Sequence, residues 1–125
     1  MRSILIIEDD QHQAELLAEL VRDVVPGDIE VDQATDLEGA LAAVLDQHYH
    51  SLCLDINLPD SDGAATYLTL RTKAKGNIVV YTIDQRAAGR VRKVLENNDV
   101  VVTKQEDPGM VSLQIVAGAY LEAAG

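Results

Sequence analysis

The sequence predicts a doubly wound α/β fold in which a strand is followed by a helix five times. Short apolar runs alternate with segments of helical apolar spacing along the 125 residues of the chain. The runs are continuous, which is typical of parallel strands that are covered on both faces. No internal repeat, low-complexity stretch or linker interrupts the alternation. We therefore expect one open parallel sheet with helices on both faces, joined by right-handed crossovers.

Five segments are expected to form the strands of this sheet. They are residues 4–7, 29–31, 52–54, 78–81 and 100–102. The second is the weakest, because Glu30 interrupts it and produces an alternating pattern. The other four consist of apolar residues alone, which predicts buried strands.

The first two helices are predicted from their apolar faces. These faces consist of Leu16, Leu17, Leu20, Val21 and Val24 in the first helix and Leu37, Leu41, Val44 and Leu45 in the second. Pro26 and Gly27 end the first helix. Thr35 and Glu38 have the spacing of a capping box at the start of the second.

The remaining helices have weaker apolar faces but recognisable ends. The third is expected over Ala64–Lys73, before Gly76, and Val91, Val94 and Leu95 mark the fourth. Asp107 followed by Pro108 begins the fifth, because Asp is a preferred N-cap and Pro a preferred first helical residue.

Composition and charge exclude several classes of function. The formal net charge of −11 argues against direct nucleic-acid binding, which depends on Lys and Arg that neutralise phosphates. No apolar stretch approaches the roughly 18 residues that span a membrane, and acidic residues directly after the first strand exclude a signal peptide. The single cysteine, Cys53, is expected to be a buried core residue in a reducing compartment. We therefore expect a cytoplasmic single domain over residues 1–125.

Polar side chains follow four of the five expected strands. Glu8 and Asp9 follow the first strand, Asp55 the third, Thr82 the fourth and Lys104 the fifth. Ligands of open α/β sheets bind beyond the carboxyl ends of the strands, so these residues are expected to share one site. Close carboxylates repel each other by about 4 kcal/mol per pair at an effective dielectric of 20. Lys104 and a divalent cation would offset this repulsion, and oxygen ligands favour Mg²⁺ or Mn²⁺.

A carboxylate beside a cation, a hydroxyl and a lysine indicates phosphoryl transfer with the carboxylate as nucleophile. Asp55 would attack phosphorus and become an acyl phosphate. Mg²⁺ and Lys104 would neutralise the equatorial oxygens, and the Thr82 hydroxyl would donate to one of them. We expect no turnover enzyme, because Asn57 cannot act as the general acid that a haloacid-dehalogenase-type phosphatase requires.

The most specific motif of the chain is Leu54-Asp55-Ile56-Asn57-Leu58-Pro59-Asp60-Ser61-Asp62-Gly63. Together with the Glu8-Asp9 pair, Thr82 and Lys104, it resembles the response-regulator receiver domain of two-component signalling, over the whole chain. The resemblance implies a flavodoxin-like three-layer sandwich, (βα)5, with strand order 2-1-3-4-5. It also implies phosphotransfer from a histidine kinase or a histidine phosphotransfer protein, with switching of the surface formed by helix 4, strand 5 and helix 5.

The resemblance assigns roles around the phosphoryl group by position. Asp55 matches the phospho-acceptor, Thr82 the switch hydroxyl and Lys104 the lysine of the family. Asn57 and Asp84 match positions that tune the lifetime of the acyl phosphate. Asp84 is also expected to cap the fourth helix.

The resemblance likewise implies the ligands of the cation. Asp9 matches the direct Mg²⁺ ligand, Glu8 the acid that holds metal-bound waters, and the carbonyl of Asn57 the third protein ligand beside Asp55. Asp10 matches no family role and is expected to favour the first helix as an early acid.

Three residues depart from the pattern of the family. Val101 replaces the usual aromatic residue, Gln105 the usual proline, and Ile83 the usual small residue after the threonine. A valine cannot signal by rotating a ring, so any switch is expected to rely on movement of the fourth helix and fifth strand. Ile83 is predicted to narrow access to the acyl phosphate and so to slow both phosphorylation by small donors and hydrolysis. The departures also leave an alternative open, a receiver-like interaction module that no longer switches on phosphorylation.

The basic residues indicate a second surface. Residues 1–62 contain fifteen acidic and two basic residues, and residues 63–125 contain six acidic and eight basic ones. Arg86, Arg90, Arg92 and Lys93 lie on or near the fourth helix and are either a solvated face or a docking surface. A docking surface of this charge would bind an acidic partner or a second copy of the chain, giving a homodimer.

Two further patterns are expected to carry no ligand. His12, His48 and His50 are expected to be solvated surface residues. Asp60-Ser61-Asp62-Gly63 resembles a calcium loop, but Gly63 at its sixth position would place Leu58 at the first, where a carboxylate is required. Asp62 is therefore expected to be a turn or cap residue before the third helix.

Overall fold

A computed structural model describes residues 2–24, 29–96, 98–104, 109, 111 and 114–116. The strands are β1 (Arg2–Ile7), β2 (Ile29–Ala34), β3 (Ser51–Leu54), β4 (Asn57–Leu58), β5 (Ser61–Asp62), β6 (Asn77–Thr82) and β7 (Val100–Thr103). The helices are α1 (Gln11–Val24), α2 (Leu37–Asp46), α3 (Ala64–Lys73) and α4 (Gln85–Arg92). Residues 109, 111 and 114–116 are also helical, in the region of the expected fifth helix, whose predicted start at Asp107 lies outside the described residues.

Five of the strands form one parallel sheet in the order β2-β1-β3-β6-β7. Since β6 and β7 are the fourth and fifth strands expected from the sequence, the predicted order 2-1-3-4-5 is confirmed. In the register of β1, Ile7 lies opposite Ala34 of β2 and Leu54 of β3. The neighbouring strands β1 and β3 therefore end at the same level, and the residues that follow them emerge together.

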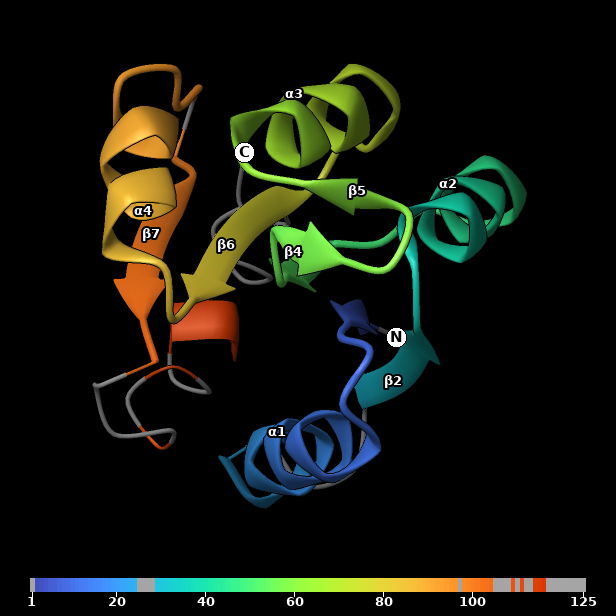
Figure 1. Ribbon diagram of the computed structural model, residues 1–125. Helices are drawn as coiled ribbons and strands as arrows, with labels where there is room; N and C mark the ends of the chain where they lie inside the picture. Colours follow the sequence, from blue (N-terminus) through green and yellow to red (C-terminus); the bar gives the residue numbers. More distant parts are fainter. Residues whose placement is uncertain are drawn as a thin grey trace.

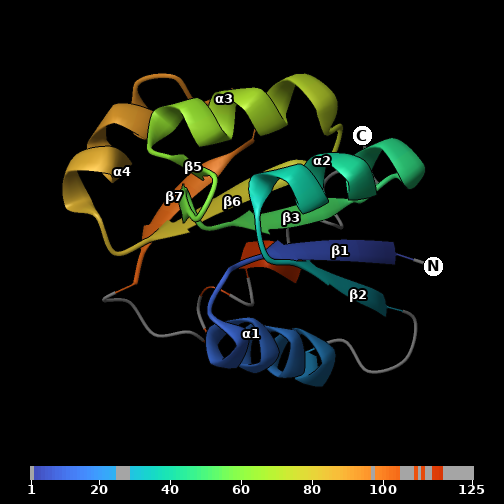
Figure 2. The same cartoon turned by 45° about the vertical axis from the view of Figure 1, so that its right-hand side comes forward.

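Helices cover both faces of the sheet, which confirms the three-layer sandwich (Figure 2). Leu5 and Ile7 of β1 pack into the core under α2, α3 and α4, whereas Ile4 and Ile6 pack into the core that contains α1. Both sets of side chains are buried. This explains why β1 is apolar throughout, because each successive side chain enters one of two cores.

Aspartates cap three of the helices. Asp10 Oδ1 accepts hydrogen bonds from the backbone N–H groups of His12 and Gln13 at the start of α1. Asp84 caps α4, as predicted. Asp36, and not Thr35 of the predicted capping box, caps α2, because its Oδ1 accepts from Gly39 N at 2.7 Å.

A short antiparallel hairpin that the sequence pattern did not predict lies between β3 and α3 and is formed by β4 and β5 (Figure 1). Asp62 lies in β5 and does not cap α3, so that prediction was wrong. The N-cap of α3 is Gly63, with a φ of 71° that favours glycine and no side-chain cap.

A buried ion pair attaches α3 to the sheet. The carboxylate of Asp99 accepts from Arg71 Nη1 at 2.9 Å, from the Tyr67 hydroxyl at 2.5 Å and from Ile78 N at 2.8 Å. Arg71 Nη2 donates to the carbonyl oxygens of Ala74 and Gly76. These bonds join α3 to β6 and to the segment before β7, at the edge of the sheet where the strands begin.

Other differences from the sequence analysis are local. Helix α4 ends at Arg92, so Val94 and Leu95 pack against the core from beyond it. His12 and His48 are exposed as predicted, but His50 is half-buried and its Nδ1 accepts from Ser3 N at 3.1 Å. Burial raises the pKa of Cys53, which is consistent with the predicted core residue.

Candidate functional site

The predicted polar residues emerge at one edge of the sheet, where its parallel strands end. Backbone hydrogen bonds fix them there by continuing the ladder past the strands. Glu8 N donates to Ala34 O at 2.9 Å and Asp55 N donates to Ile7 O at 3.0 Å. Lys104 N donates to Thr82 O at 2.8 Å. The backbone of the sheet thus fixes the spacing of these residues independently of the contacts of their side chains.

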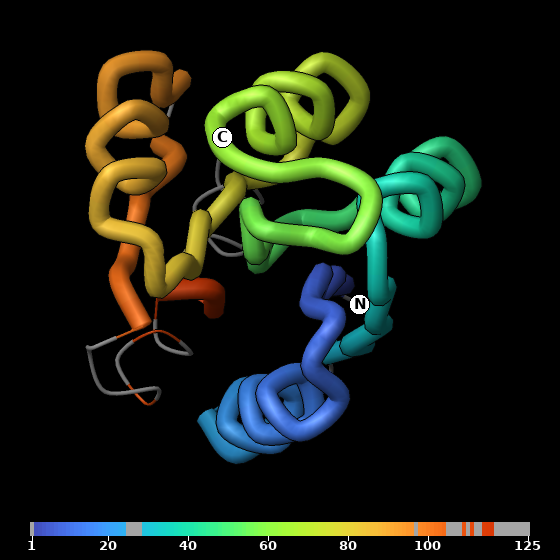
Figure 3. The backbone as a smooth tube through the Cα atoms, in the orientation of Figure 1, coloured from blue at the N-terminus to red at the C-terminus, as the bar shows by residue number. Residues whose placement is uncertain are grey.

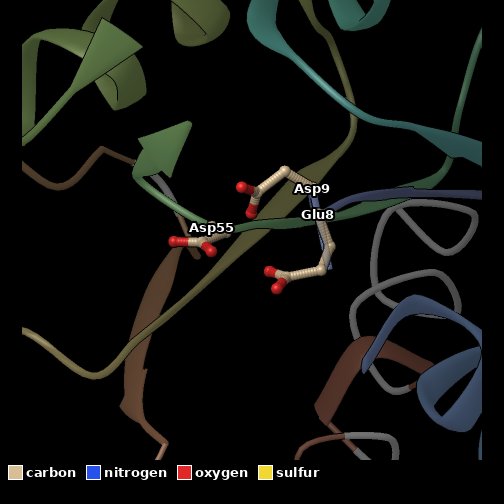
Figure 4. Close-up of side chains that lie close together, drawn as sticks. All are labelled: Glu8, Asp9 and Asp55. Carbon is tan, nitrogen blue, oxygen red and sulfur yellow. The ribbon is translucent and has the colours of Figure 1, made fainter. Parts of the chain in front are cut away.

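Three carboxylates converge at this edge. Glu8, Asp9 and Asp55 each offer an oxygen, and these oxygens all lie within 4.8 Å of one another (Figure 4). Glu8 and Asp55 are buried, with 4% and 7% of their surface exposed, whereas Asp9 is exposed. The cluster therefore has two carboxyl groups held against the sheet and a third that is open to solvent.

Lys104 joins the two buried carboxylates. Its Nζ lies 3.2 Å from Asp55 Oδ2 and 3.3 Å from each carboxylate oxygen of Glu8. The same Nζ lies 5.4 Å from the centre of the Tyr81 ring, a cation–π distance that the sequence analysis did not anticipate. Lys104 is consequently directed into the carboxylate cluster and supplies its neighbouring positive charge.

The ionisation of the site follows from this crowding. Burial, with the neighbouring Asp55, raises the pKa of Glu8 to about 8, even though Lys104 opposes the shift. Burial alone would lower the pKa of Lys104, but the charges of Asp55 and Glu8 outweigh it and raise that pKa. Without a further positive charge the buried Glu8 therefore resists ionisation, and a cation bound between the carboxylates would favour its charged form.

The donor set fits a hard divalent cation such as Mg²⁺ or Mn²⁺. All three clustered groups offer carboxylate oxygens, and the exposed Asp9 leaves space for water ligands. Cys53, the nearest soft donor in sequence to Asp55, is buried in the core. Glu8, Asp9 and Asp55 are therefore the side chains that could hold such an ion.

Asn57 controls the orientation of Asp55. Its backbone N–H donates to Asp55 Oδ1 at 2.9 Å, while Lys104 donates to Oδ2. Both oxygens of the Asp55 carboxylate are thus held. Asn57 is also the first residue of β4, so the hairpin that the sequence analysis missed begins at the site.

Thr82 and Asp84 connect the same edge to helix α4. Thr82 is fully buried, and its Oγ1 accepts from Asp84 N at 3.1 Å. Asp84 Oδ1 in turn accepts from the N–H groups of Arg86 and Ala87, both at 3.0 Å. Ile83 between them is 65% exposed. The hydroxyl at the end of β6 is therefore two hydrogen bonds from the first turn of α4.

The predicted basic residues do not enter the carboxylate cluster. Arg86, Arg90 and Arg92 are exposed on α4, and Lys93 is exposed at its C-cap. Among the described residues, no helix combines the length and apolar character needed to cross a bilayer.

Comparisons with known proteins agree with this geometry. The structure is similar to that of a two-component response regulator from Clostridium difficile, with a TM-score of 0.81 and 20% identity over 100% of both chains. It is also similar to the receiver domain of the Francisella response regulator 1452, with a TM-score of 0.79 and 16% identity over 97% of this chain and 98% of that one. A CheY-like receiver domain from Methylobacillus flagellatus gives a TM-score of 0.73 and 24% identity over 100% and 99% of the two chains.

These identities show the fold alone, and the search of curated proteins finds no match. The family model of the response regulator receiver domain matches residues 4–115, which is most of the chain. The chain therefore belongs to the response regulator receiver domain family.

Proposed function

We propose that Asp55 accepts a phosphoryl group from the phosphohistidine of a histidine kinase or a histidine phosphotransfer protein, in a reaction that requires Mg²⁺. The observation that carries this proposal is the contact of Lys104 Nζ with Asp55 Oδ2 inside a cluster of three carboxylates. The chain then acts as a phosphorylated switch and catalyses only its own acylation and slow dephosphorylation. It works in the cytoplasm, as one domain over residues 1–125.

In the transfer step, a carboxylate oxygen of Asp55 attacks phosphorus as the bond from phosphorus to the imidazole nitrogen breaks. The imidazole leaves with the electron pair of that bond, and Asp55 becomes an acyl phosphate. Lys104 donates to a phosphoryl oxygen from its place beside Asp55 Oδ2, and the Thr82 hydroxyl donates to another. A bound Mg²⁺ would supply charge neutralisation at the phosphoryl oxygens.

Three other groups would hold the cation together with Asp55. Asp9, which is exposed, would be the direct ligand, and Glu8, which is buried, would hold water on the ion. The carbonyl of Asn57 would be the third protein ligand. Asn57, Ile83 and Asp84 control access to the acyl phosphate and its lifetime.

The hydrogen bonds of Thr82 support a switch that does not need an aromatic ring. Rotation of the Thr82 side chain toward a phosphoryl group would withdraw its Oγ1 from Asp84 N. Asp84 caps α4, so the start of that helix would lose part of its support. Val101 is partly buried against the core and has no ring to reorient. Movement of α4 and β7 is then the output of phosphorylation.

The moving surface is the proposed partner surface. Arg86, Arg90, Arg92 and Lys93 give it a positive charge that would steer an acidic partner or a second copy of the acidic chain. Charge reversal at Arg90 and Arg92 is expected to weaken the binding of that partner. It should also make the remaining affinity less dependent on salt. An affinity that ignores both the double change to glutamate and ionic strength contradicts this surface.

The proposed function is tested by measuring acylation of Asp55. The protein is incubated with Mg²⁺ and acetyl phosphate, or with a phosphorylated histidine phosphotransfer protein, and the covalent phosphate is measured by intact mass. We expect one phosphate on the wild type and on Asp46→Asn, a control at an exposed aspartate of α2, and none on Asp55→Asn. Beryllofluoride should bind the same two proteins.

A wild type that neither accepts phosphate nor binds beryllofluoride contradicts the proposal. That result favours the alternative of a receiver-like interaction module that no longer switches, which Val101, Gln105 and Ile83 motivate.

A further inference from the structure

The turn of the β4–β5 hairpin is hydrogen-bonded to the beginning of helix α2. Leu58 pairs with Ser61, so Pro59 and Asp60 form the turn between the two strands. Asp60 Oδ1 accepts from the backbone N–H of Leu37 at 2.9 Å, and Asp60 Oδ2 accepts from that of Glu38 at 3.0 Å. Figure 3 shows the turn reaching the start of α2. Both oxygens of one carboxylate are therefore bound to the first turn of a helix that precedes it by more than twenty residues.

The other end of the hairpin is bound to the candidate site. Asn57, the first residue of β4, donates its N–H to Asp55 Oδ1. Asn57 pairs with Asp62 of β5, so the hairpin has only two pairs and little stiffness of its own. The two pairs alone therefore do not hold Asn57 in place, and loss of the anchor at the turn would let Asn57 shift away from the oxygen of Asp55 that it holds.

The attachment point on α2 is fixed. Leu37 is buried in the core, with 8% of its surface exposed, so its amide cannot follow the hairpin. The two N–H groups are among those that an α-helix leaves unpaired at its start, and a carboxylate is the acceptor that the helix dipole favours there. These hydrogen bonds lower the pKa of Asp60, although the side chain is exposed.

A second aspartate binds the same helix end without reaching the hairpin. Asp36 Oδ1 accepts from Gly39 N at 2.7 Å, within the segment that leads into α2. Asp36 therefore contributes one side-chain capping bond to α2, and Asp60 contributes two. Asp60 differs because it also joins the helix to the site.

We propose that Asp60 is a positioning residue, which holds Asn57 and Asp55 in place for cation binding by anchoring the β4–β5 turn to the start of α2. The inference rests on the proposed function, because it concerns the same site. Coupling is reciprocal, so a cation bound at Asp55 should also stabilise the first turn of α2.

The affinity for Mg²⁺, measured by calorimetry without a phosphodonor, tests this role. Asp60→Ala should weaken Mg²⁺ binding by about tenfold. This is the low end of the loss in metal affinity that follows when a group that orients metal ligands is removed. The control Asp36→Ala should stay within twofold of the wild type, although both variants lose a cap and should melt at reduced temperatures. Asp60→Asn keeps an oxygen acceptor and should recover part of the affinity, and it replaces Asp60→Ala if that variant does not fold.

Amide hydrogen exchange gives a readout that does not depend on affinity. Saturating Mg²⁺ should slow exchange at the amides of Leu37 and Glu38 in the wild type and in Asp36→Ala, but not in Asp60→Ala. Equal Mg²⁺ affinities of the Asp60 and Asp36 variants, or equal slowing in both, overturn the inference while the proposed function stands. A wild type that binds no Mg²⁺ overturns both.

Discussion

Replacing Lys104 with methionine removes the positive charge that contacts the two buried carboxylates and keeps an unbranched side chain. Lys104 Nζ lies 3.2 Å from Asp55 and 3.3 Å from Glu8, and its attraction to one ionised carboxylate at this distance is worth about 5 kcal/mol at an effective dielectric of 20 before desolvation. After desolvation, loss of one partner from a buried pair typically costs about 3–5 kcal/mol. The lysine side chain is 15% exposed, which favours the lower value. We expect Lys104→Met to lose about 3 kcal/mol of unfolding free energy without divalent cations.

Mg²⁺ should reduce the loss of unfolding free energy in Lys104→Met, because the cation takes over the neutralisation of the carboxylates from the lysine ammonium. At saturating Mg²⁺, the recovered free energy must equal the difference in binding free energy between the two proteins. A recovery of about 1.4 kcal/mol therefore requires a tenfold tighter Mg²⁺ affinity in the variant. Acylation of Asp55 should nonetheless become slower, since Lys104 no longer donates to the phosphoryl oxygens.

Urea unfolding followed by circular dichroism, with EDTA and with saturating Mg²⁺, measures the first quantity, and calorimetry measures the second. Lys75→Met is a matched control, because Lys75 is exposed and lies before β6, at the opposite edge of the sheet. It should change neither quantity appreciably. The reasoning is refuted if Lys104→Met loses the same stability with and without Mg²⁺, or if it binds Mg²⁺ more weakly than the wild type.

Three other changes test separate features. Ile83→Ala should accelerate both acylation by acetyl phosphate and hydrolysis of the acyl phosphate, because Ile83 is expected to narrow access; unchanged rates reject this role. Arg71→Met leaves the buried carboxylate of Asp99 without its cation and should lower the unfolding free energy by about 3 kcal/mol; a loss below about 1 kcal/mol would mean that the pair is not desolvated. Burial and its bond to Asp99 raise the pKa of Tyr67 from 10.0 to about 12, so the advantage of the wild type over Tyr67→Phe should be full below pH 10 and decline toward pH 12. Urea titrations of both proteins across this range would show no convergence if the shift were absent.

The sheet and the convergence of the three carboxylates could be predicted because both depend on short-range pattern. The apolar run of β1 ends directly before Glu8, and that of β3 ends directly before Asp55. Parallel strands bring their carboxyl ends to one edge, so a residue that follows one strand is placed beside a residue that follows the next. The convergence of Glu8, Asp9 and Asp55 follows from this rule. The cap of α4 was predictable for a similar reason, since Asp84 lies within three residues of the amides it accepts from.

Contacts between distant segments had no comparable signal. The Tyr81 ring near Lys104 and the pair of Arg71 with Asp99 depend on side-chain directions that only the assembled core determines. Their partners are 23 and 28 residues apart in the sequence, and neither spacing has a period that pattern analysis recognises.

Asp60 shows how such a contact escapes prediction even inside the most specific motif of the chain. Its position between Pro59 and Ser61 favours a solvated aspartate in a turn, and its exposed surface agrees with that interpretation. Both of its carboxylate oxygens nevertheless accept hydrogen bonds from backbone amides of α2, which in an isolated helix would bind water. The sequence shows that α2 needs an acceptor at its start, and Asp36 satisfies only part of that need. Local caps such as Asp36 leave some amides at the start of a helix unpaired, and a carboxylate from a distant turn can bind them. In α2 that carboxylate is Asp60, whose hairpin begins at the candidate site.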